Sequence, residues 1–409
     1  MTSPDPTPGG TPSTDVVVHV FGRTDVGRTR EHNEDAFVVA DLTTDNATLQ
    51  PEVRTHILGN RGTLFMVADG MGGAAAGEIA SAMATDVVLA ELRRIWLTAE
   101  KSDAETFAAA LKGATEAANA RIHQYALDHP EHRGMGTTAT IAGMHGDSLI
   151  LAQVGDSRAY LVRDGVARQL TKDQSLIQKL VEAGELTPEE AEQSERRNII
   201  LQALGPEANI KTDLTVQQIR KGDVLVLCSD GLSGQIRIED ISESVNSTPD
   251  LTALCKKLID LANTNGGPDN ITVVAARFEG EGLQAAAETD SVGHRQFRFG
   301  GDARATMPMS PAEVGAITAE VPAMGPVGAT APPPVEPAEA LTFDESKMIV
   351  RQSGHRTTPK PAAKAVPTPT KGAPISLPKG PNWLMWAGIA VVVGIAGYFI
   401  ITLWFPGQP

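Results

Sequence analysis

The distribution of proline most constrains which part of this chain can fold. Of the 27 prolines, 15 lie in residues 281–382, which are also rich in alanine and poor in aromatic residues. Such a composition buries too little apolar surface to offset the loss of chain entropy, so we predict a disordered linker. Residues 1–14 lack apolar periodicity and a signal-peptide core, and we expect a disordered tail there. A folded domain is therefore predicted for residues 15–280.

The distribution of charge follows the same division. The chain has 35 Lys and Arg residues against 50 Asp and Glu residues, a net charge of −15. Residues 1–280 hold 25 of the bases and 40 of the acids, which accounts for the whole imbalance. Because nucleic-acid binders usually present a basic surface, this balance disfavours nucleic acid as a partner. The two cysteines cannot make a disulfide framework, and we expect a reducing compartment.

A hydrophobic segment follows the linker. Residues 383–405 carry no charge and have aromatic residues at both ends. Since about 20 helical residues span a bilayer core, we predict a transmembrane helix, with a short extracytoplasmic tail at 406–409. Residues 346–382 hold seven bases and no acid. The positive-inside rule then predicts a single-pass protein of the cell membrane with its long N-terminal part, the folded domain, in the cytoplasm. The bases either contact anionic lipid or are only solvated.

Strand-like and helix-like patterns alternate in runs within residues 15–280. Two alanine-rich segments without proline, 75–97 and 105–127, are long enough for helices, and a further helix is expected near 251–261. Asp164-Gly165 is a hairpin-turn signal. Runs of strands with pairs of helices between them indicate antiparallel sheets covered by helices, an α+β fold. The predicted strands are 16–21, 64–68, 137–143, 149–154, 158–162, 166–170, 223–228 and 271–278.

Five acidic turns lie at the ends of predicted strands, mostly beside glycine. An Asp after a strand projects from the end of the sheet, and a following glycine lets the backbone turn sharply. Several carboxylates in one place repel one another, and divalent cations relieve that repulsion. Ligands that are all oxygen favour Mg²⁺ or Mn²⁺, and the nine histidines show no spacing typical of zinc sites. The turns contain Asp35, Asp69, Asp156, Asp230 and Asp269.

Longer strings around these turns carry a resemblance to a known family. In chain order they are VADGMGG (67–73), GTTA (136–139), VGDSRAY (154–160), LTKDQS (170–175), LCSDGL (227–232) and GGPDNIT (266–272). This series resembles the ordered motifs of the metal-dependent serine/threonine phosphatases of the PPM or type 2C family, over about residues 16–279. The resemblance implies a four-layer α-β-β-α sandwich, in which a central antiparallel β-sandwich is flanked by helices. With the membrane segment, the chain is similar to bacterial members that oppose membrane-bound Ser/Thr kinases.

The resemblance also implies ligands for two metal ions. Asp69 would bridge the two ions together with a water, and the carbonyl of Gly70 would bind one of them. Asp230 and Asp269 would bind the other ion, and Asp35 would act mainly through waters. Two such ions, Mn²⁺ or Mg²⁺, would make a nucleophilic hydroxide near neutral pH and neutralise phosphate charge.

Other residues take less direct roles in the resemblance. Arg30 occupies the position of a phosphate-binding guanidinium, whose planar fork suits bidentate recognition, unless it is only a surface charge. Asp156 matches a ligand for a third metal ion, or else it only holds its turn through Arg158. Glu34 would assist the metal site, and Asn270 would orient the neighbouring ligand. Three hydroxyl residues are interpreted as structural rather than catalytic: Thr137, Thr138 and Ser157.

The chain departs from one family pattern at Met71. Many eukaryotic relatives have a histidine there, proposed as the general acid, and methionine cannot donate a proton. The acid is then a metal-bound water or His32, unless His32 is a partly exposed residue without a proton-transfer role. Residues 172–204 resemble the flap that borders the site in bacterial members, where we expect substrate selectivity. Asn198 lies near the position where some relatives add a flap ligand to the third metal.

The favoured function is a Mn²⁺- or Mg²⁺-dependent phosphatase that removes phosphate from Ser and Thr of cytoplasmic proteins and opposes a membrane Ser/Thr kinase. The alternative is a membrane-tethered pseudophosphatase or binding module, which is disfavoured because every expected metal-binding Asp is present. Neither cysteine lies in a Cys-x5-Arg loop, which disfavours a cysteine phosphatase. The dipeptide Gly-Lys does not occur, so the chain has no P-loop of an ATPase.

Overall fold

The computed structural model describes residues 15–300, except 49–50, 73–75, 188–189, 192–193 and 195–198. The predicted N-terminal tail, the predicted linker beyond residue 300, the predicted membrane segment 383–405 and the tail at 406–409 therefore lie outside the described residues. Within the part that is described, no helix combines the length and the apolar character needed to cross a membrane.

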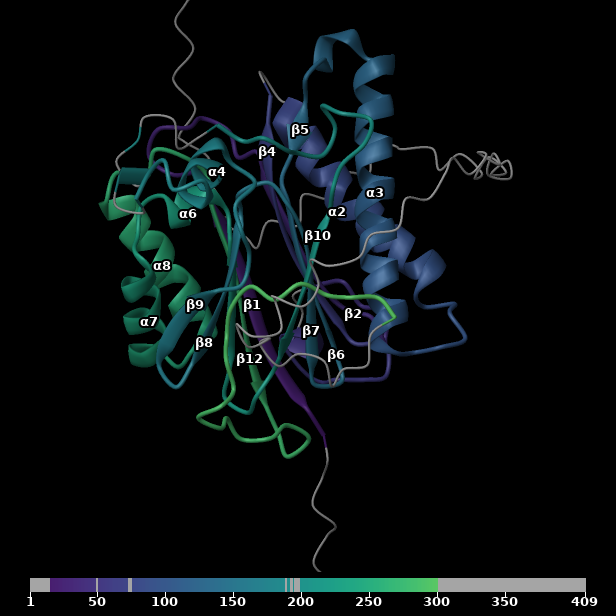
Figure 1. Ribbon diagram of the computed structural model, residues 1–409, viewed down its shortest axis with the longest axis vertical. Helices are drawn as coiled ribbons and strands as arrows, with labels where there is room; N and C mark the ends of the chain where they lie inside the picture. Colours follow the sequence, from purple (N-terminus) through teal and green to yellow (C-terminus); the bar gives the residue numbers. More distant parts are fainter. Residues whose placement is uncertain are drawn as a thin grey trace, which may run out of the picture. The chain divides into compact units, whose positions relative to one another are not determined.

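Two antiparallel β-sheets form the centre of the domain (Figure 1). The first sheet has the strand order β3-β1-β12-β11-β8-β9, and the second has the order β10-β7-β6-β4-β2. The first sheet contains β1 (Val17–Asp25), β3 (Thr55–Ile57), β8 (Arg158–Arg163), β9 (Val166–Gln169), β11 (Val224–Cys228) and β12 (Ile271–Glu279). The second contains β2 (Asp35–Asp41), β4 (Thr63–Met71), β6 (Ala139–His145), β7 (Ser148–Val154) and β10 (Asp213–Gln218), and β5 (Gly136–Thr137) pairs with β4.

Helices cover the outer face of each sheet. Figure 1 shows α2 (Ala76–Ile95) and α3 (Ala104–Asp128) on one side, and α7 (Ile238–Ser247) and α8 (Leu251–Thr264) on the other. Fully buried side chains of α2 and α3 pack on the second sheet, and those of α7 and α8 pack on the first. The layers are therefore helix, sheet, sheet and helix, which confirms the α+β class and the α-β-β-α sandwich. Shorter helices are α1 (Pro51–Arg54), α4 (Leu176–Glu182), α6 (Asp230–Ser233) and a 3-10 helix, Pro130–His132.

Strand β4 shows why its sequence is an unbroken apolar run. Phe65 and Val67 point into the core between the two sheets, whereas Leu64 and Met66 point toward the helices, as the two-residue period of a strand requires. Phe65 meets Phe278 of β12 edge to face, with the ring centres 6.2 Å apart. Because both faces of β4 are buried, the position of its C-terminal end is closely determined by packing.

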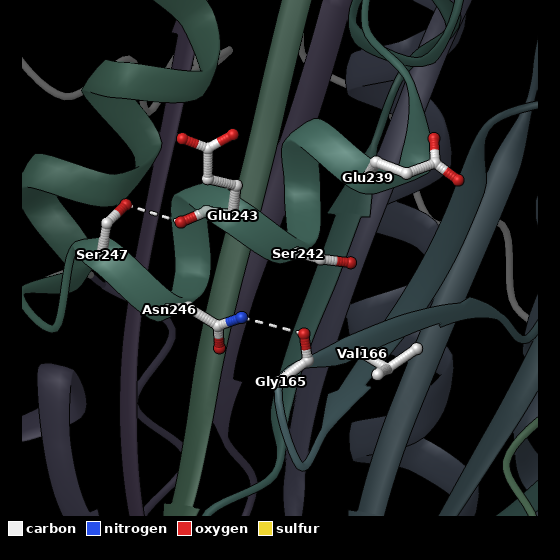
Figure 2. Close-up of a pocket in the computed structure, with 7 residues that line it drawn as sticks. All are labelled: Gly165, Val166, Glu239, Ser242, Glu243, Asn246 and Ser247. Atoms are coloured by element: carbon white, nitrogen blue, oxygen red, sulfur yellow. Dashed lines mark hydrogen bonds between the residues drawn. The ribbon is translucent and has the colours of Figure 1, made fainter.

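The predicted hairpin at Asp164-Gly165 is confirmed. Both residues have positive φ, 50° and 79°, as a two-residue turn that matches the strand twist requires. The hairpin packs against α7, where the Nδ2 of Asn246 donates to the carbonyl of Gly165 at 2.9 Å (Figure 2). The Oγ of Ser242 accepts from the amide of Ala167 at 2.9 Å. An open groove lies between the hairpin and α7, and none of the five predicted carboxylates lines it.

Several elements differ from the sequence prediction. The strand predicted at 137–143 is divided into β5 and β6, because Thr138 bonds with the backbone of Asp69 instead of continuing the ladder. Eight of the described elements were not predicted: β2, β3, β10, α1, α4, α6, α7 and the 3-10 helix. The helices predicted at 75–97 and 105–127 are confirmed as α2 and α3. The Oδ1 of Asp103 caps the start of α3 by accepting from the amide of Thr106 at 2.8 Å.

Residues 281–300 pack on the domain, past the predicted boundary at 280. They run beside β10, the last strand of the second sheet, where the amide of Val216 donates to the carbonyl of Arg295 and the amide of Phe297 to the carbonyl of Leu214, both at 2.9 Å. Leu283 is 4% exposed and belongs to the core between the sheets. We call residues 281–300 the strap. The first proline after residue 280 is Pro308, so the strap contains none of the prolines on which the linker prediction rested.

The packing of the strap predicts that loss of one of its buried side chains lowers the stability of the domain. Replacing Leu283 by Ala removes a buried side chain from the core between the sheets, and we expect the free energy of unfolding to fall by about 2–4 kcal/mol. Urea denaturation measures this. Leu127→Ala is the control, because Leu127 is 64% exposed and its loss changes stability by roughly 0.5 kcal/mol or less. Equal effects of the two substitutions would mean that the strap does not stay packed in solution.

Candidate functional site

The fold brings the five predicted carboxylates to one end of the two sheets. Asp35 at the start of β2 is the direct cross-strand partner of Asp69 on β4. Asp230 follows β11 and begins α6, and Asp269 precedes β12, the neighbour of β11. Asp156 lies between β7 and β8, and it lines a cavity of about 110 Å³ together with Asp230 and Asp269. The strand order therefore brings the acidic turns together, as predicted.

Asp35 is a buried carboxylate with one oxygen free. Its Oδ2 accepts hydrogen bonds from the hydroxyls of Ser229 and Thr272, both at 2.7 Å. Its Oδ1 is buried and has no hydrogen-bond partner among the described residues. The pKa of Asp35 is raised to about 7, mainly by burial. The two hydrogen bonds from hydroxyl groups oppose this shift, and the charge of the nearby Asp230 adds to it. The free oxygen of such a group suits a cation or a water bound to one.

Asp69 is held through its backbone. Its amide donates to the Oγ1 of Thr138 at 2.9 Å, and its carbonyl accepts from the amide of Thr138 and the hydroxyl of Thr137, both at 2.9 Å. The Oγ1 of Thr138 also lies 2.7 Å from the Oγ of Ser157. The three hydroxyl residues interpreted as structural thus support this backbone. Burial, with Asp35 and Asp230 beside it, raises the pKa of Asp69 well above its usual range.

Gly70 occupies a position that no larger residue can take. A Cβ added there would lie 2.2 Å from the carbonyl oxygen of Gly77 and 2.5 Å from that of Glu34. The Gly70 amide donates to the Glu34 carbonyl at 3.2 Å, and the hydroxyl of Ser81 donates to the same oxygen at 2.5 Å. The glycine of the ADG string is therefore explained by the close approach of three segments. Binding of a metal by its carbonyl stays a prediction.

Asp156 is buried, and within the part of the chain that the structure describes the Oδ1 of its side chain has no hydrogen-bond partner. Burial, followed by the charges of Asp230 and Asp173, raises its pKa to about 7. Arg158 does not hold the turn by binding Asp156. Its Nε and Nη2 instead donate to the carboxylate of Asp173, at 3.0 and 2.7 Å. Asp156 is therefore left with an oxygen available for a ligand.

Asp173 is a site residue that the sequence reasoning did not single out. It lines the same cavity as Asp156, Asp230 and Asp269. Its position was open to prediction, since it is the acidic residue of the string LTKDQS, which matched the family. Its ion pair with Arg158 gives it a supporting role beside the three predicted ligands.

Arg30 lies at the edge of the site, bound to a predicted metal ligand. Its Nη2 is 2.9 Å from the Oδ2 of Asp269, and the two side chains are 51% and 32% exposed. The other oxygen of Asp269 accepts from the amide of Asn270 at 2.9 Å. Arg30 thus lies beside a predicted metal ligand, and its role in binding phosphate stays a prediction.

Asn270 fastens the loop before β2 to the site. Its Nδ2 donates to the carbonyls of Val26 and His32 at 3.0 and 2.9 Å, and its Oδ1 accepts from the amide of Glu34 at 2.8 Å. Burial raises the pKa of Glu34, which lies in this loop. The backbone carbonyl of His32 accepts one of these hydrogen bonds. The general-acid role predicted for the side chain of His32 stays untested. Asn198 falls outside the described residues.

The donor set fits divalent cations that prefer oxygen. Among the described residues, no three Asp, Glu, His or Cys side chains are already gathered tightly enough to enclose an ion. Burial and the charge of Asp269 raise the pKa of Asp230, and a hydrogen bond with Asp69 opposes that shift. Carboxylates alone, with raised pKa values and free oxygens, suit Mg²⁺ or Mn²⁺ rather than zinc.

Comparison with known sequences decides the family. The sequence model of the protein phosphatase 2C family matches residues 44–273, more than half of the chain. The chain belongs to the protein phosphatase 2C family. Among its relatives, serine/threonine phosphatase stp of Listeria innocua is 37% identical over 257 residues, which cover 63% of this chain and 94% of that protein. Serine/threonine protein phosphatase PstP of Mycobacterium tuberculosis is 42% identical over 214 residues, 52% of this chain and 40% of that protein.

Solved structures of serine/threonine phosphatases share the fold. The serine/threonine phosphatase PstP/Ppp of Mycobacterium tuberculosis matches with a TM-score of 0.53 and 38% identity, over 64% of this chain and 99% of that chain. The catalytic domain of PstP in complex with two manganese ions matches with a TM-score of 0.52 and 37% identity, over the same shares. The likeness therefore covers nearly the whole of each solved domain.

The raised pKa values in this 2C-family site predict that the cation-free protein loses stability as the pH rises. A folded state that holds a proton more tightly than the unfolded state loses that advantage between the unfolded and folded pKa, here from about 4 to about 7. Asp35→Asn cannot ionise, so at about pH 8 its free energy of unfolding should exceed that of the wild type by roughly 1–3 kcal/mol.

Urea denaturation with a chelator, at about pH 5 and about pH 8, measures this difference. Asp128→Asn at the exposed end of α3 is the control, and its profile should follow the wild type. Parallel profiles for Asp35→Asn and the wild type would contradict the assigned burial of charge at Asp35.

Proposed function

We propose that this chain is a cation-dependent protein phosphatase that hydrolyses phosphoserine and phosphothreonine. As a member of the 2C family it is a serine/threonine phosphatase. The observation that supports cation-dependent hydrolysis is the cluster of buried carboxylates with raised pKa values. Cations stabilise the charged form of buried carboxylates that have raised pKa values and free oxygens. Manganese in the related PstP catalytic domain supports Mn²⁺ or Mg²⁺ as the cofactor here.

The residues that would hold two cations are Asp69 with the Gly70 carbonyl, Asp230 and Asp269, with Asp35 behind them. When bound, the cations supply an activated water and neutralise phosphate charge. Asp35 is kept in place by Ser229 and Thr272, so its free Oδ1 has a defined direction. Asp156, with its own free oxygen, would hold a third cation.

Arg30 would bind the phosphate group of the substrate. Its guanidinium is half exposed and pairs with Asp269, which lines the cavity. A cation on Asp269 would weaken that ion pair, because it competes for the same carboxylate and repels the guanidinium. Arg30 would then turn its planar fork to the phosphate, which it suits as a bidentate donor.

Substitution of one predicted ligand tests the catalytic proposal. Asp230→Asn is expected to lower the Mn²⁺-dependent release of phosphate from a phosphothreonine peptide by about a hundredfold or more, because a ligand charge is lost where the cations bind. Asp128→Asn, distant in sequence and exposed, should retain the wild-type rate. A wild-type protein that binds Mn²⁺ and releases no phosphate would instead support the alternative, a pseudophosphatase acting as a binding module.

We further propose that the domain is tethered to the cell membrane and faces the cytoplasm, where a membrane Ser/Thr kinase would be its partner. Support comes from the sequence alone: 23 uncharged residues at 383–405, with seven bases and no acid in the 37 residues before them. The proline-rich composition of residues 301–382 suits a disordered tether that lets the domain reach its substrates.

Cell fractionation tests the tether. We expect the full-length chain in the membrane fraction, released by detergent and not by high salt, since a segment of this hydrophobicity inserts effectively irreversibly. A chain shortened before residue 383 should be soluble with its phosphatase activity intact. Recovery of the intact full-length chain in the soluble fraction without detergent would rule out the membrane anchor.

A further inference from the structure

The loop between β1 and β2 is hydrogen-bonded to the segment before β12. The amide of Arg28 donates to the carbonyl of Gly267 at 2.7 Å. The side chain of Asn270 binds two further carbonyls of this loop, one near each end, as described above. We call residues 26–33 the arginine loop, because they include Arg28 and Arg30. The backbone of the arginine loop is therefore fixed against the segment that carries a predicted metal ligand.

Gly27 brings the arginine loop into close contact with Asp269. Its φ is 81°, and an added Cβ would lie 2.1 Å from the carbonyl oxygen of Asp269. Its amide donates to the Oδ1 of Asp25 at 3.0 Å, and the Nδ2 of Asn263 donates to the same oxygen at 3.1 Å. The positive φ and the lack of space both require glycine here. The position of the next residue, Arg28, is therefore determined by its backbone neighbours and not by its own side chain.

The side chain of Arg28 is exposed, and its aliphatic stem passes close to Gly267. A Cβ added to Gly267 would lie only 3.0 Å from the Cγ of Arg28. Gly267 stands two residues before Asp269, which pairs with Arg30 at 2.9 Å. Two residues of backbone span at most about 7 Å. The two arginines therefore lie along one short segment, and both are near a predicted metal ligand.

Arg28 and Arg30 differ in their charged partners. Arg30 pairs with Asp269, whereas no acidic side chain among the residues that the structure describes forms an ion pair with Arg28. Residues 1–280 hold 40 acids and 25 bases, so most of the surface of the domain disfavours an acidic peptide. An exposed guanidinium without an acidic partner attracts a carboxylate at one place beside the carboxylate cluster.

We propose that Arg28 is a specificity-determining residue, which binds a carboxylate of the substrate within about three residues of the phosphorylated Ser or Thr. An extended peptide advances about 3.3 Å per residue, so one to three residues cover about 3–10 Å. The short backbone distance between Gly267, which Arg28 overlies, and Asp269 falls within this range. The preferred substrates are then phosphopeptides with a neighbouring Asp or Glu. The inference rests on the proposed function, because it requires the phosphorylated residue to bind at the carboxylate cluster.

Paired phosphothreonine peptides test this preference. The two members of a pair differ at one position within three residues of the phosphothreonine, where one has Asp and the other has Asn. With Mn²⁺ present, we expect the full-length wild type to show a kcat/KM about threefold higher for the Asp member of at least one pair, because an exposed ion pair contributes modestly to binding. The difference should lie in KM rather than in kcat. A wild type that prefers no Asp member at any position would overturn the proposal.

Arg28→Gln should abolish the preference, since Gln keeps the aliphatic stem beside Gly267 and removes the charge. Arg28→Glu should reverse it, so that a peptide with Lys at the same position becomes the better substrate. Arg94→Gln is the matched control, because it removes the same charge about 25 Å along α2 from Gly77, the neighbour of Gly70. Persistence of the preference in Arg28→Gln, or an equal loss in Arg94→Gln, would contradict the assignment.

A small aryl phosphate separates specificity from catalysis. Such a substrate has no neighbouring residues, so its Mn²⁺-dependent hydrolysis should be the same in the wild type and in Arg28→Gln. If hydrolysis of the aryl phosphate falls as much as hydrolysis of the Asp peptide, Arg28 acts on catalysis in general, and the proposed role is wrong.

A failure of the proposed function would be visible separately. A wild type that hydrolyses neither the aryl phosphate nor any of the peptides would contradict the phosphatase proposal. Fluorescence anisotropy of the same peptides, labelled and with Mn²⁺ present, would then decide the role of Arg28. Tighter binding of the Asp member by the wild type, and not by Arg28→Gln, would support the selection of a carboxylate, and equal binding of both members by the wild type would overturn it.

Discussion

Repulsion among buried carboxylates is the constraint on which this end of the fold depends. Asp35 and Asp69 face each other across two strands, and Asp230 lies close enough to Asp69 to share a hydrogen bond with it. Such an arrangement of charged carboxylates is unfavourable at neutral pH unless a cation is bound, because each charge is buried beside others. Packing of β4 on both faces, and hydroxyl groups under the carboxylates, maintain it. Repulsion among these carboxylates lowers the stability of the fold. Because a bound cation relieves that repulsion, the same carboxylates favour cation binding.

The acidic residues of the site were predictable because each lies in a short local string. Asp69, Asp230 and Asp269 stand where strands end, and antiparallel neighbours bring those ends together. The groups that orient them were not predictable in the same way. Ser229 and Thr272 reach Asp35 from positions 194 and 237 residues away in the sequence, and nothing in their own strings distinguishes them from ordinary hydroxyl residues.

The fold class followed from periodicity, whereas the limits of the fold did not. The long alanine-rich helices and the apolar strands are recognisable because their patterns repeat over many residues. The division between β5 and β6 depends on two hydrogen bonds of Thr138 to another strand, which no local pattern reveals. The strap is polar and alanine-rich, so its composition suggested a linker, although Leu283 and its backbone hydrogen bonds attach it to the sheet.

The strap also changes how neighbouring copies of the chain can meet. β10 ends the second sheet, and an uncovered edge strand offers unpaired backbone groups to any other strand. Backbone hydrogen bonds from residues 295–297 occupy part of that edge. Wherever many copies are confined to one surface, collisions between sheet edges become frequent, and a covered edge protects them from joining into aggregates. The strap therefore contributes to solubility under crowding as well as to the stability of a single domain.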